Sequence, residues 1–156
     1  MKNVQILVVS DSHGESDRLW ELCERHPEID TVCHLGDGMR EAEDMAAVYP
    51  HRRFFWVAGN CDFAMMSPPL MREECVAGKR LFLTHGHLFG VKGDLTRLAE
   101  AGLARGVEAV LFGHTHRPFE EWRNGMLLFN PGSLKNGDYG ILTLSEEGIY
   151  PRHHNI

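Results

Sequence analysis

The stretch VQILVVSDSHG, residues 4 to 14, sets the fold class expected of this chain. Its first six residues are mostly apolar and β-branched, and the apolar run ends abruptly at Ser10 and Asp11. A short apolar run of this kind is typical of a strand that is buried on both faces, as in a parallel sheet. We therefore predict a buried strand at 4–9 that places Asp11 and His13 just beyond its carboxyl end.

The chain beyond this strand first alternates helical and extended patterns and then becomes mostly extended. Helices are predicted at 15–26, which Pro27 terminates, at 39–48 and at 92–104. Further strands are predicted at 31–35, 53–58, 73–77, 80–84, 109–112, 119–123, 126–129 and 141–144, with a Pro-rich loop at 67–69. This order favours one α/β domain over residues 1–156, built on one mixed sheet or on two stacked sheets.

Composition and charge narrow the class of protein. The chain has 156 residues, 43% of them hydrophobic and 24% charged, as in ordinary soluble globular proteins. A formal net charge of -6 argues against an extended nucleic-acid partner. The four cysteines form no CxxC pair and favour free thiols in a reducing compartment, the cytoplasm. The apolar runs are too short for a membrane span, so no membrane partner is expected, and the sequence leaves a homo-oligomer open.

Potential metal ligands follow five of the predicted strands. In chain order these are Asp11 and His13, Asp37, Asn60 and Asp62, His85 and His87, and His114 and His116. Taken singly, each has an ordinary structural explanation: Asn60 suits a turn, Asp37 suits a helix N-terminus, and the histidines suit a surface. The carboxyl ends of strands in an open α/β sheet form one crevice, however, so these side chains should converge there.

The kinds of ligand indicate two ions and an anionic substrate. Four histidines, two carboxylates and one amide exceed what a single tetrahedral zinc site uses. They suit two divalent ions that share a bridging carboxylate. Two such ions carry four positive charges against two carboxylates, which leaves a locally positive pocket that favours a small phosphate ester.

Five motifs carry a resemblance to a known family. They are DSH at 11–13, GD at 36–37, GNCD at 59–62, HGH at 85–87 and GHTH at 113–116. In their wording and order they resemble the calcineurin-like metallophosphoesterases, and more closely the small bacterial and archaeal phosphodiesterases of that superfamily. The resemblance implies a four-layer α-β-β-α sandwich with two mixed sheets. It also implies hydrolysis of small phosphodiesters by attack of a metal-bound hydroxide at a dinuclear centre.

The resemblance assigns roles to individual residues. It implies that the first metal is held by Asp11, His13 and His116, the second by Asn60, His85 and His114, with Asp37 bridging the two. Mn²⁺ is the expected ion, with Ni²⁺, Fe, Zn²⁺ and Mg²⁺ as alternatives. Asp37 and Asn60 are expected to act in catalysis, with His87 donating a hydrogen bond to the phosphate or the leaving group. Asp62 is expected to orient its neighbours, and the NPGS loop at 130–133 to form a tight turn or to contact the substrate.

Two departures from the family pattern leave alternatives open. Cys61 stands where many members have a histidine, and a thiol of pKa about 8.5 is a poor general acid near neutrality. Arg40 stands where many relatives have an acid. The group that protonates the leaving oxygen therefore stays open. Alternative functions are a catalytically weak metal-binding scaffold for protein partners, as in a retromer subunit of the family, a phosphomonoesterase, or a nuclease.

Overall fold

Two five-stranded sheets pack face to face in the computed structural model of the chain, which describes residues 3–62 and 69–156. The first sheet contains β1 (Val4–Val9), β2 (Thr31–His34), β3 (Arg53–Trp56), β9 (Asp138–Ser145) and β10 (Gly148–Asn155), in the order β10-β9-β1-β2-β3. The second contains β4 (Met71–Val76), β5 (Lys79–Thr84), β6 (Ala109–Leu111), β7 (Pro118–Arg123) and β8 (Met126–Pro131), in the order β4-β5-β6-β8-β7.

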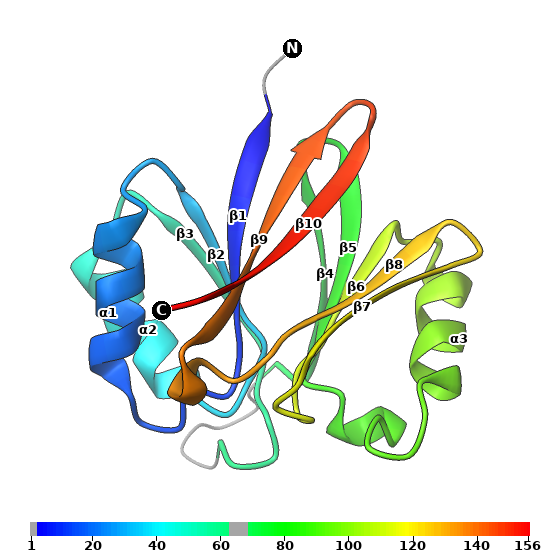
Figure 1. Cartoon of the computed structure of the whole chain (residues 1–156), viewed down its shortest axis with the longest axis horizontal. Coiled ribbons are helices and arrows are strands. Elements are labelled where there is room, and N and C mark those ends of the chain that lie inside the picture. The colour runs from blue at the N-terminus through cyan, green and yellow to red at the C-terminus, as the bar shows by residue number, and fades with distance from the viewer. Residues whose placement is uncertain (1–2, 63–68) are drawn as a thin grey trace.

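Helices cover the outer face of each sheet (Figure 1). The first sheet carries α1 (Ser16–Arg25) and α2 (Met39–Val48), and the second carries α3 (Thr96–Arg105). Two single-turn 3₁₀ helices, η1 (His87–Phe89) and η2 (Leu134–Asn136), lie in the loops. The four-layer α-β-β-α arrangement implied by the resemblance is therefore confirmed.

The alternation of side chains along each strand fills three apolar layers. In β1, Ile6 and Val8 pack between the two sheets, whereas Leu7 and Val9 pack against α1 and α2. The third layer lies between the second sheet and α3. Both faces of β1 are therefore buried, which explains why its sequence is apolar almost throughout.

Six strands run in one direction and end on the same side of the molecule. β1, β2 and β3 are parallel neighbours in the first sheet, as are β5, β6 and β8 in the second. Their carboxyl ends lie at the lower end of the molecule in Figure 1. The loops that leave these ends carry every predicted ligand.

The structure differs from the sequence prediction in two elements. β10 was not predicted, because GIYPRHHN has few apolar residues and contains Pro151. Proline is tolerated in this strand because β10 is at the edge of its sheet, where one side of the backbone has no partner strand. Helix α3 begins at Thr96 and not at residue 92, because Asp94 Oδ1 accepts the Thr96 N–H and residues 91–93 form turns.

Part of the predicted Pro-rich loop, residues 67 and 68, lies outside the described residues. Within residues 3–62 and 69–156, no helix is long and apolar enough to cross a membrane.

Candidate metal centre

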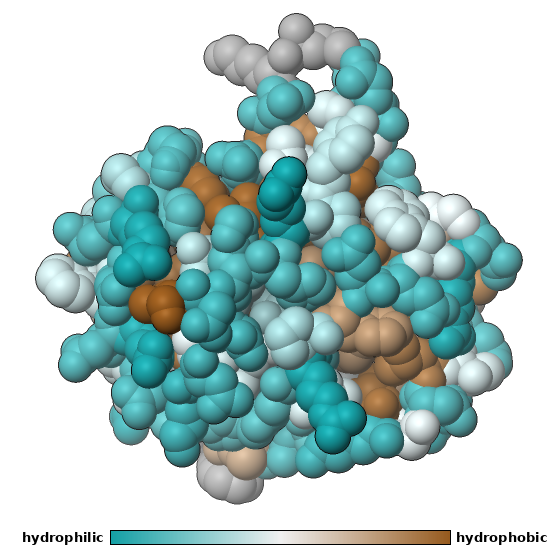
Figure 2. Space-filling model, viewed as in Figure 1, coloured by the Kyte–Doolittle hydropathy of each residue, from teal (hydrophilic) through white to brown (hydrophobic). Residues whose placement is uncertain are grey.

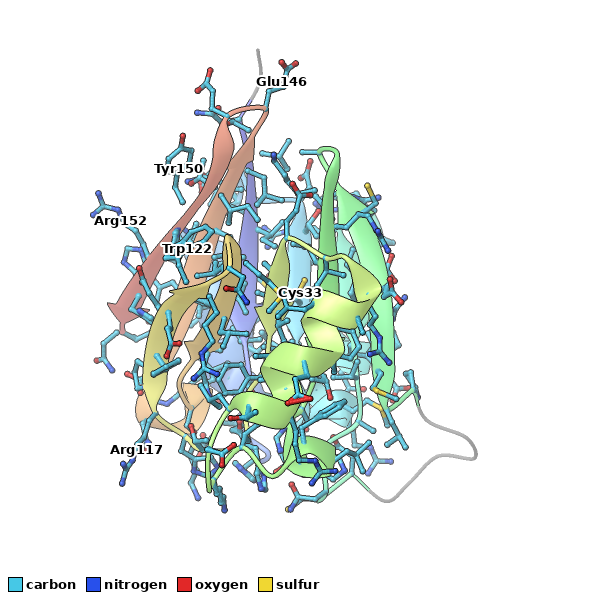
Figure 3. The ribbon with its side chains drawn as sticks, turned by 90° about the vertical axis from the view of Figure 1, so that its right-hand side faces the viewer. Cys33, Arg117, Trp122, Glu146, Tyr150 and Arg152 are labelled. Atoms are coloured by element: carbon cyan, nitrogen blue, oxygen red, sulfur yellow. The ribbon has the colours of Figure 1, made fainter. Side chains whose placement is uncertain are left out.

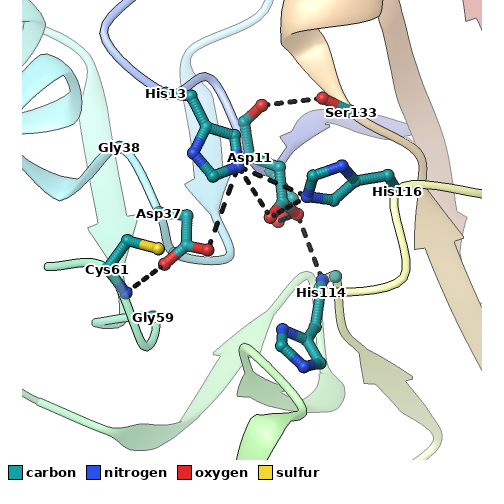
Figure 4. Close-up of polar contacts among 12 residues, drawn as sticks. Asp11, His13, Asp37, Gly38, Gly59, Cys61, His114, His116 and Ser133 are labelled. Carbon is teal, nitrogen blue, oxygen red and sulfur yellow. Dashed lines mark hydrogen bonds and ion pairs between the residues drawn. The ribbon is translucent and has the colours of Figure 1, made fainter. Parts of the chain in front are cut away.

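The loops after the parallel strands bring six of the seven predicted metal ligands close together, and the seventh, Asn60, stays apart (Figure 4). Asp11, His13 and His116 form one trio of potential ligand atoms, and Asp37, His85 and His114 form another. In each trio the atoms lie within 4.8 Å of one another. Each trio draws on both sheets, so neither sheet could build the site alone.

Only one of the two carboxylate oxygens of Asp11 accepts hydrogen bonds from the described residues. Its Oδ2 accepts hydrogen bonds from Ser10 Oγ at 2.6 Å and from the His114 N–H at 3.1 Å. Its Oδ1 is buried and has no hydrogen-bond partner among the described residues, yet it lies 3.1 Å from His116 Nε2 and 3.4 Å from His13 Nε2. Leaving a buried carboxylate oxygen unsatisfied is costly. A divalent cation between these three atoms would remove that cost, so the donor set fits a metal.

A hydrogen bond orients His85 toward the second trio. Burial alone would lower the pKa of this ring, but Asp37 and Asp11 outweigh burial and raise the pKa, so a cation would have to displace its proton. Its Nδ1 donates a hydrogen bond to the Leu35 carbonyl at 2.7 Å, which leaves the Nε2 lone pair free when the ring is neutral. His85 Nε2 lies 3.2 Å from Asp37 Oδ2 and 3.2 Å from His114 Nδ1. These three atoms form the second set of donors around a common point.

Asp37, a member of the second trio, also approaches the first trio. Its Oδ1 accepts the Cys61 N–H at 2.8 Å, and its Oδ2 also lies 3.9 Å from His13 Nε2, a member of the first trio. This position is the one that a bridging carboxylate would need.

The protonation states around Asp37 suit cation binding. Burial alone would raise the pKa of Asp37, but the hydrogen bond and charge of His85 lower it overall. Burial, the His85 imidazole and the Lys92 ammonium, in that order, lower the pKa of His114 to about 4. Asp37 is therefore ionised and His114 neutral near pH 7, so both offer lone pairs.

Backbone strain is concentrated on the same residues. Seven described residues other than glycine have positive φ, and five of them are Asp11, His13, Asp37, His114 and His116, with φ between 45° and 72°. This conformation costs a non-glycine residue of the order of 1 kcal/mol or more and is found mainly where a function requires it. The left-handed turns direct these side chains inward from the strand ends.

Asp62 holds two of the ligand loops together. Its Oδ2 accepts the N–H groups of Asp37 and Gly59, both at 2.8 Å. Its Oδ1 accepts those of Gly38 and Met39, at 3.1 and 3.2 Å, at the start of α2. Its position agrees with the predicted orienting role.

A buried chain of hydrogen bonds holds Ser12, in the loop after β1, to His34 and Glu41. The Gly36 N–H donates to His34 Nδ1 at 3.1 Å, so the proton of neutral His34 is on Nε2, 2.9 Å from Ser12 Oγ. Ser12 Oγ then donates to Glu41 Oε1 at 2.9 Å. Glu41, which lies on α2, had no motif to mark it and was missed from the sequence.

The NPGS loop braces the site and forms a turn. Ser133 Oγ donates to the Asp11 carbonyl at 2.8 Å, and Asn130 Nδ2 donates to Thr115 Oγ1 at 3.0 Å. Asn130 Oδ1 accepts the Gly132 N–H at 2.9 Å, which closes the turn. Asn130 Nδ2 also donates to the Gly113 carbonyl at 3.1 Å, so the NPGS loop holds the backbone of the loop that follows β1 and of the loop that follows β6.

Three further predicted residues lie beside the trios. Asn60 is exposed, and the contact found for its side chain is with Cys61 Sγ at 3.6 Å. His87 stacks obliquely near His85, with ring centroids 5.5 Å apart, and its buried Nδ1 has no partner among the described residues. Cys61 Sγ lies within 4.8 Å of donor atoms of His13 and Asp37, a proximity that the motif did not indicate.

An open groove of about 590 Å³ adjoins His13, Asp37 and Cys61. Its wall is rich in carboxylates, and we call it the acidic groove; its charged members are Asp37, Arg40, Glu41, Glu43, Asp44 and Asp62.

Comparison with known proteins gives the family. Residues 4–146 match the calcineurin-like phosphoesterase superfamily domain. The probable metallophosphoesterase YsnB of Bacillus subtilis is 33% identical over 162 residues, covering 97% of this chain and 91% of that protein. Phosphodiesterase YfcE of Escherichia coli is 37% identical over 101 residues, covering 55% of this chain and 50% of that protein.

Solved structures share the fold. A conserved protein of Streptococcus pneumoniae, described as a predicted phosphoesterase, aligns with a TM-score of 0.78 and 24% identity over 100% of this chain and 99% of its own. Vacuolar Protein Sorting 29 from Cryptosporidium parvum aligns with a TM-score of 0.76 and 16% identity over 99% and 98%. With the motifs, the two trios and the match over residues 4–146, the chain belongs to the calcineurin-like phosphoesterase superfamily.

Proposed function

We propose that this protein is a metal-dependent phosphodiesterase that hydrolyses small phosphodiesters at a centre of two divalent ions, with Mn²⁺ as the first candidate. The observation that carries the proposal is the pair of ligand trios joined by Asp37. The name of YfcE, a phosphodiesterase similar over part of the chain, supports the preference for diesters. The four free cysteines support a reducing compartment, for which we propose the cytoplasm.

The two sets of ligands have distinct tasks in this proposal. Asp11, His13 and His116 would hold one ion, His85, His114 and Asn60 would hold the other, and Asp37 would be shared between them. The exposed Asn60 amide would turn inward to reach its ion. Bound ions would lower the pKa of a coordinated water and neutralise charge on the phosphoryl oxygens.

His87 is the proposed polar contact to the reacting phosphate. It sits beside His114, with ring centroids 6.2 Å apart, and burial lowers its pKa, so the ring is neutral near pH 7. A neutral imidazole donates one hydrogen bond but is a weak acid. The enzyme should therefore prefer diesters with good leaving groups, such as aryl esters.

Hydrolysis of bis-p-nitrophenyl phosphate tests the proposal. Chelated protein should be inactive, and Mn²⁺ should restore turnover of this diester more than of p-nitrophenyl phosphate. Asp37→Asn should abolish the restored activity and lower the number of bound ions, measured by elemental analysis. Asp30→Asn, a change at an exposed aspartate remote from the trios, serves as the matched control.

Two outcomes would contradict the proposal. Full activity after exhaustive chelation would exclude metal-dependent hydrolysis. Two tightly bound ions without hydrolysis of either ester would favour the metal-binding scaffold, the alternative that the sequence left open.

A further inference from the structure

A second cavity, of about 580 Å³, lies on the second sheet beside the GHTH loop. We call it the basic pocket and define it by Val91, Lys92, Asp94, Phe112, Arg117 and Phe119. Its volume is in the range that encloses a small organic ligand. None of these residues belongs to the two trios.

The basic pocket is built from the same loops as the metal centre. Thr115, which separates His114 from His116, lines it, and Arg117 follows His116 directly. Val91 packs on Gly86, between His85 and His87, so closely that a Cβ at Gly86 would lie 3.0 Å from Val91 Cγ2. A substrate held at the metals could therefore extend one arm into this pocket.

The apolar part of the pocket suits a planar ring. Phe119 is half-buried and packs edge-on against buried Phe112, with ring centroids 6.4 Å apart. Figure 2 shows an apolar area at the lower right of the viewed face, over the region between β7 and α3 of Figure 1. A flat group on this surface would gain burial and stacking with Phe119.

The polar part of the pocket suits an anion. Lys92 and Arg117 are exposed, and neither forms an ion pair with any described residue. Figure 3 shows Arg117 at the lower end of the ribbon, the end where the parallel strands terminate. Asp94 contributes one negative charge, but its Oδ1 accepts the Thr96 N–H at 3.0 Å. Two cations thus face one carboxylate that is already hydrogen-bonded.

The two cavities beside the centre carry opposite charge. The acidic groove has five carboxylates and Arg40, whereas the basic pocket has two cations and Asp94. A diester with one additional negative charge should therefore bind in a single orientation, with its charged arm away from the acidic groove.

We propose that the basic pocket binds the arm of a phosphodiester that carries a planar ring and a second anionic group, as a 5′-phosphorylated nucleotide unit does. This inference rests on the proposed phosphodiesterase function and specifies its substrate class. The ring lies on Phe119, and the second anion lies between Lys92 and Arg117.

Two dinucleotides that differ in one phosphate test the charge. The Mn²⁺-loaded full chain is assayed with pApA and with ApA, and preference is the ratio of the two kcat/KM values. Wild type should prefer pApA, and the double variant Lys92→Gln, Arg117→Gln should reduce that preference about fivefold. Arg152→Gln, at the upper left in Figure 3, is the matched control and should leave the preference unchanged.

A conservative pair of variants tests the ring. Phe119→Leu should raise KM for both dinucleotides about fivefold or more, because stacking on the base is lost. Phe89→Leu removes an aromatic ring from the edge of the same apolar layer without touching the pocket, and should leave both KM values unchanged. Urea unfolding of each variant establishes that the comparison is made between folded proteins.

Equal kcat/KM for pApA and ApA in wild type would overturn the inference, as would an undiminished preference in the double variant. If no diester is hydrolysed, including bis-p-nitrophenyl phosphate, the proposed function fails, and the pocket is judged by binding alone. Calorimetry with the Mn²⁺-loaded protein should then still show tighter binding of pApA than of ApA in wild type only. Equal affinities would refute the pocket assignment.

Discussion

Asp62 shows at the residue scale how a carboxylate can shape a metal site without touching it. Its four backbone N–H partners belong to the loops after β2 and β3, the loops that carry Asp37 and Asn60. An amide at this position keeps one acceptor oxygen and loses the negative charge at the start of α2. We expect Asp62→Asn to lower the free energy of unfolding by about 2–3 kcal/mol, since hydrogen bonds to charged groups are the stronger ones.

Urea unfolding measures the loss, and a Mn²⁺ titration should show weaker binding in the same variant. Asp17→Asn, an exposed acid in the first turn of α1, is the control and should cost less than about 0.5 kcal/mol. Normal stability and metal affinity of Asp62→Asn would show that the four hydrogen bonds are replaceable.

His34 gives the metal-free protein a defined dependence on pH. Burial lowers the pKa of His34 below its ordinary value of 6.5, so the folded state keeps the ring neutral while the unfolded state takes up a proton. Its contribution to stability is therefore complete above pH 6.5 and is lost as the pH falls below it. Between pH 8 and pH 5.5 the loss is of the order of 1 kcal/mol.

His34→Gln removes this titration, so the variant should lose less stability than wild type over the same pH interval. Urea unfolding at pH 8 and pH 5.5 in the presence of EDTA measures both proteins under conditions where metal binding does not contribute. If both proteins lose the same unfolding free energy between pH 8 and pH 5.5, groups other than His34 cause the loss.

At the scale of elements, the helices and strands that are marked by a local pattern of apolar residues were predicted best from the sequence. Strands buried on both faces, such as β1, have runs that can be recognised, and α2 occurs at its predicted bounds of 39–48. β10 has no such run, because an edge strand with one exposed face tolerates polar residues and proline. The start of α3 depends on a single hydrogen bond from the Thr96 N–H to Asp94.

In the candidate site, too, residues marked by a local motif could be predicted and residues placed by long-range contacts could not. The convergence of the candidate ligands could be predicted because each follows a recognisable strand and belongs to one of the five motifs. Glu41 could not be predicted, because its partner Ser12 is far away in the sequence and meets it only in the folded chain. The NPGS loop was noted, but the hydrogen bond from Ser133 to the Asp11 carbonyl was not foreseen for the same reason. No local pattern specifies such a long-range contact.

Gly59 shows how closely the loops after β2 and β3 approach each other. A Cβ at this position would lie 2.2 Å from Asp37 Oδ1 and 2.6 Å from the Asp37 nitrogen. Gly59→Ala must therefore displace Asp37, and we expect a loss of about 1–3 kcal/mol in unfolding free energy.

The same variant should bind Mn²⁺ more weakly, which equilibrium titration measures. Gly148→Ala is the control, because the nearest atom to a Cβ there is 3.8 Å away. If Gly59→Ala retains wild-type affinity, the position of Asp37 is less constrained than the contact implies.

At the scale of the whole molecule, the metal centre joins two sheets that are otherwise held together mainly by apolar packing. Ions bound there would stabilise the folded state only, by about 2.7 kcal/mol when free metal exceeds the dissociation constant a hundredfold. For a chain of this size that corresponds to a rise in Tm of about 5–10 °C.

Thermal unfolding in EDTA and in Mn²⁺ checks this expectation. Asp37→Asn should show a smaller rise in Tm than wild type, because a member of the second trio that also approaches the first is altered. Equal Tm values with and without Mn²⁺ in wild type would mean that no ion binds the folded protein in preference to the unfolded chain.

The common direction of the six parallel strands gives the molecule two unlike poles. One pole carries the ligand loops, while the turns at Ala77-Gly78, Asn124-Gly125 and Glu146-Glu147 lie at the other. Asn124 and Ala77 are the remaining described non-glycine residues with positive φ, and they serve only to reverse the chain. A surface tether, a fluorescent label or a fused domain attached at the turn pole would hold every molecule in the same orientation, with its chemistry facing outward.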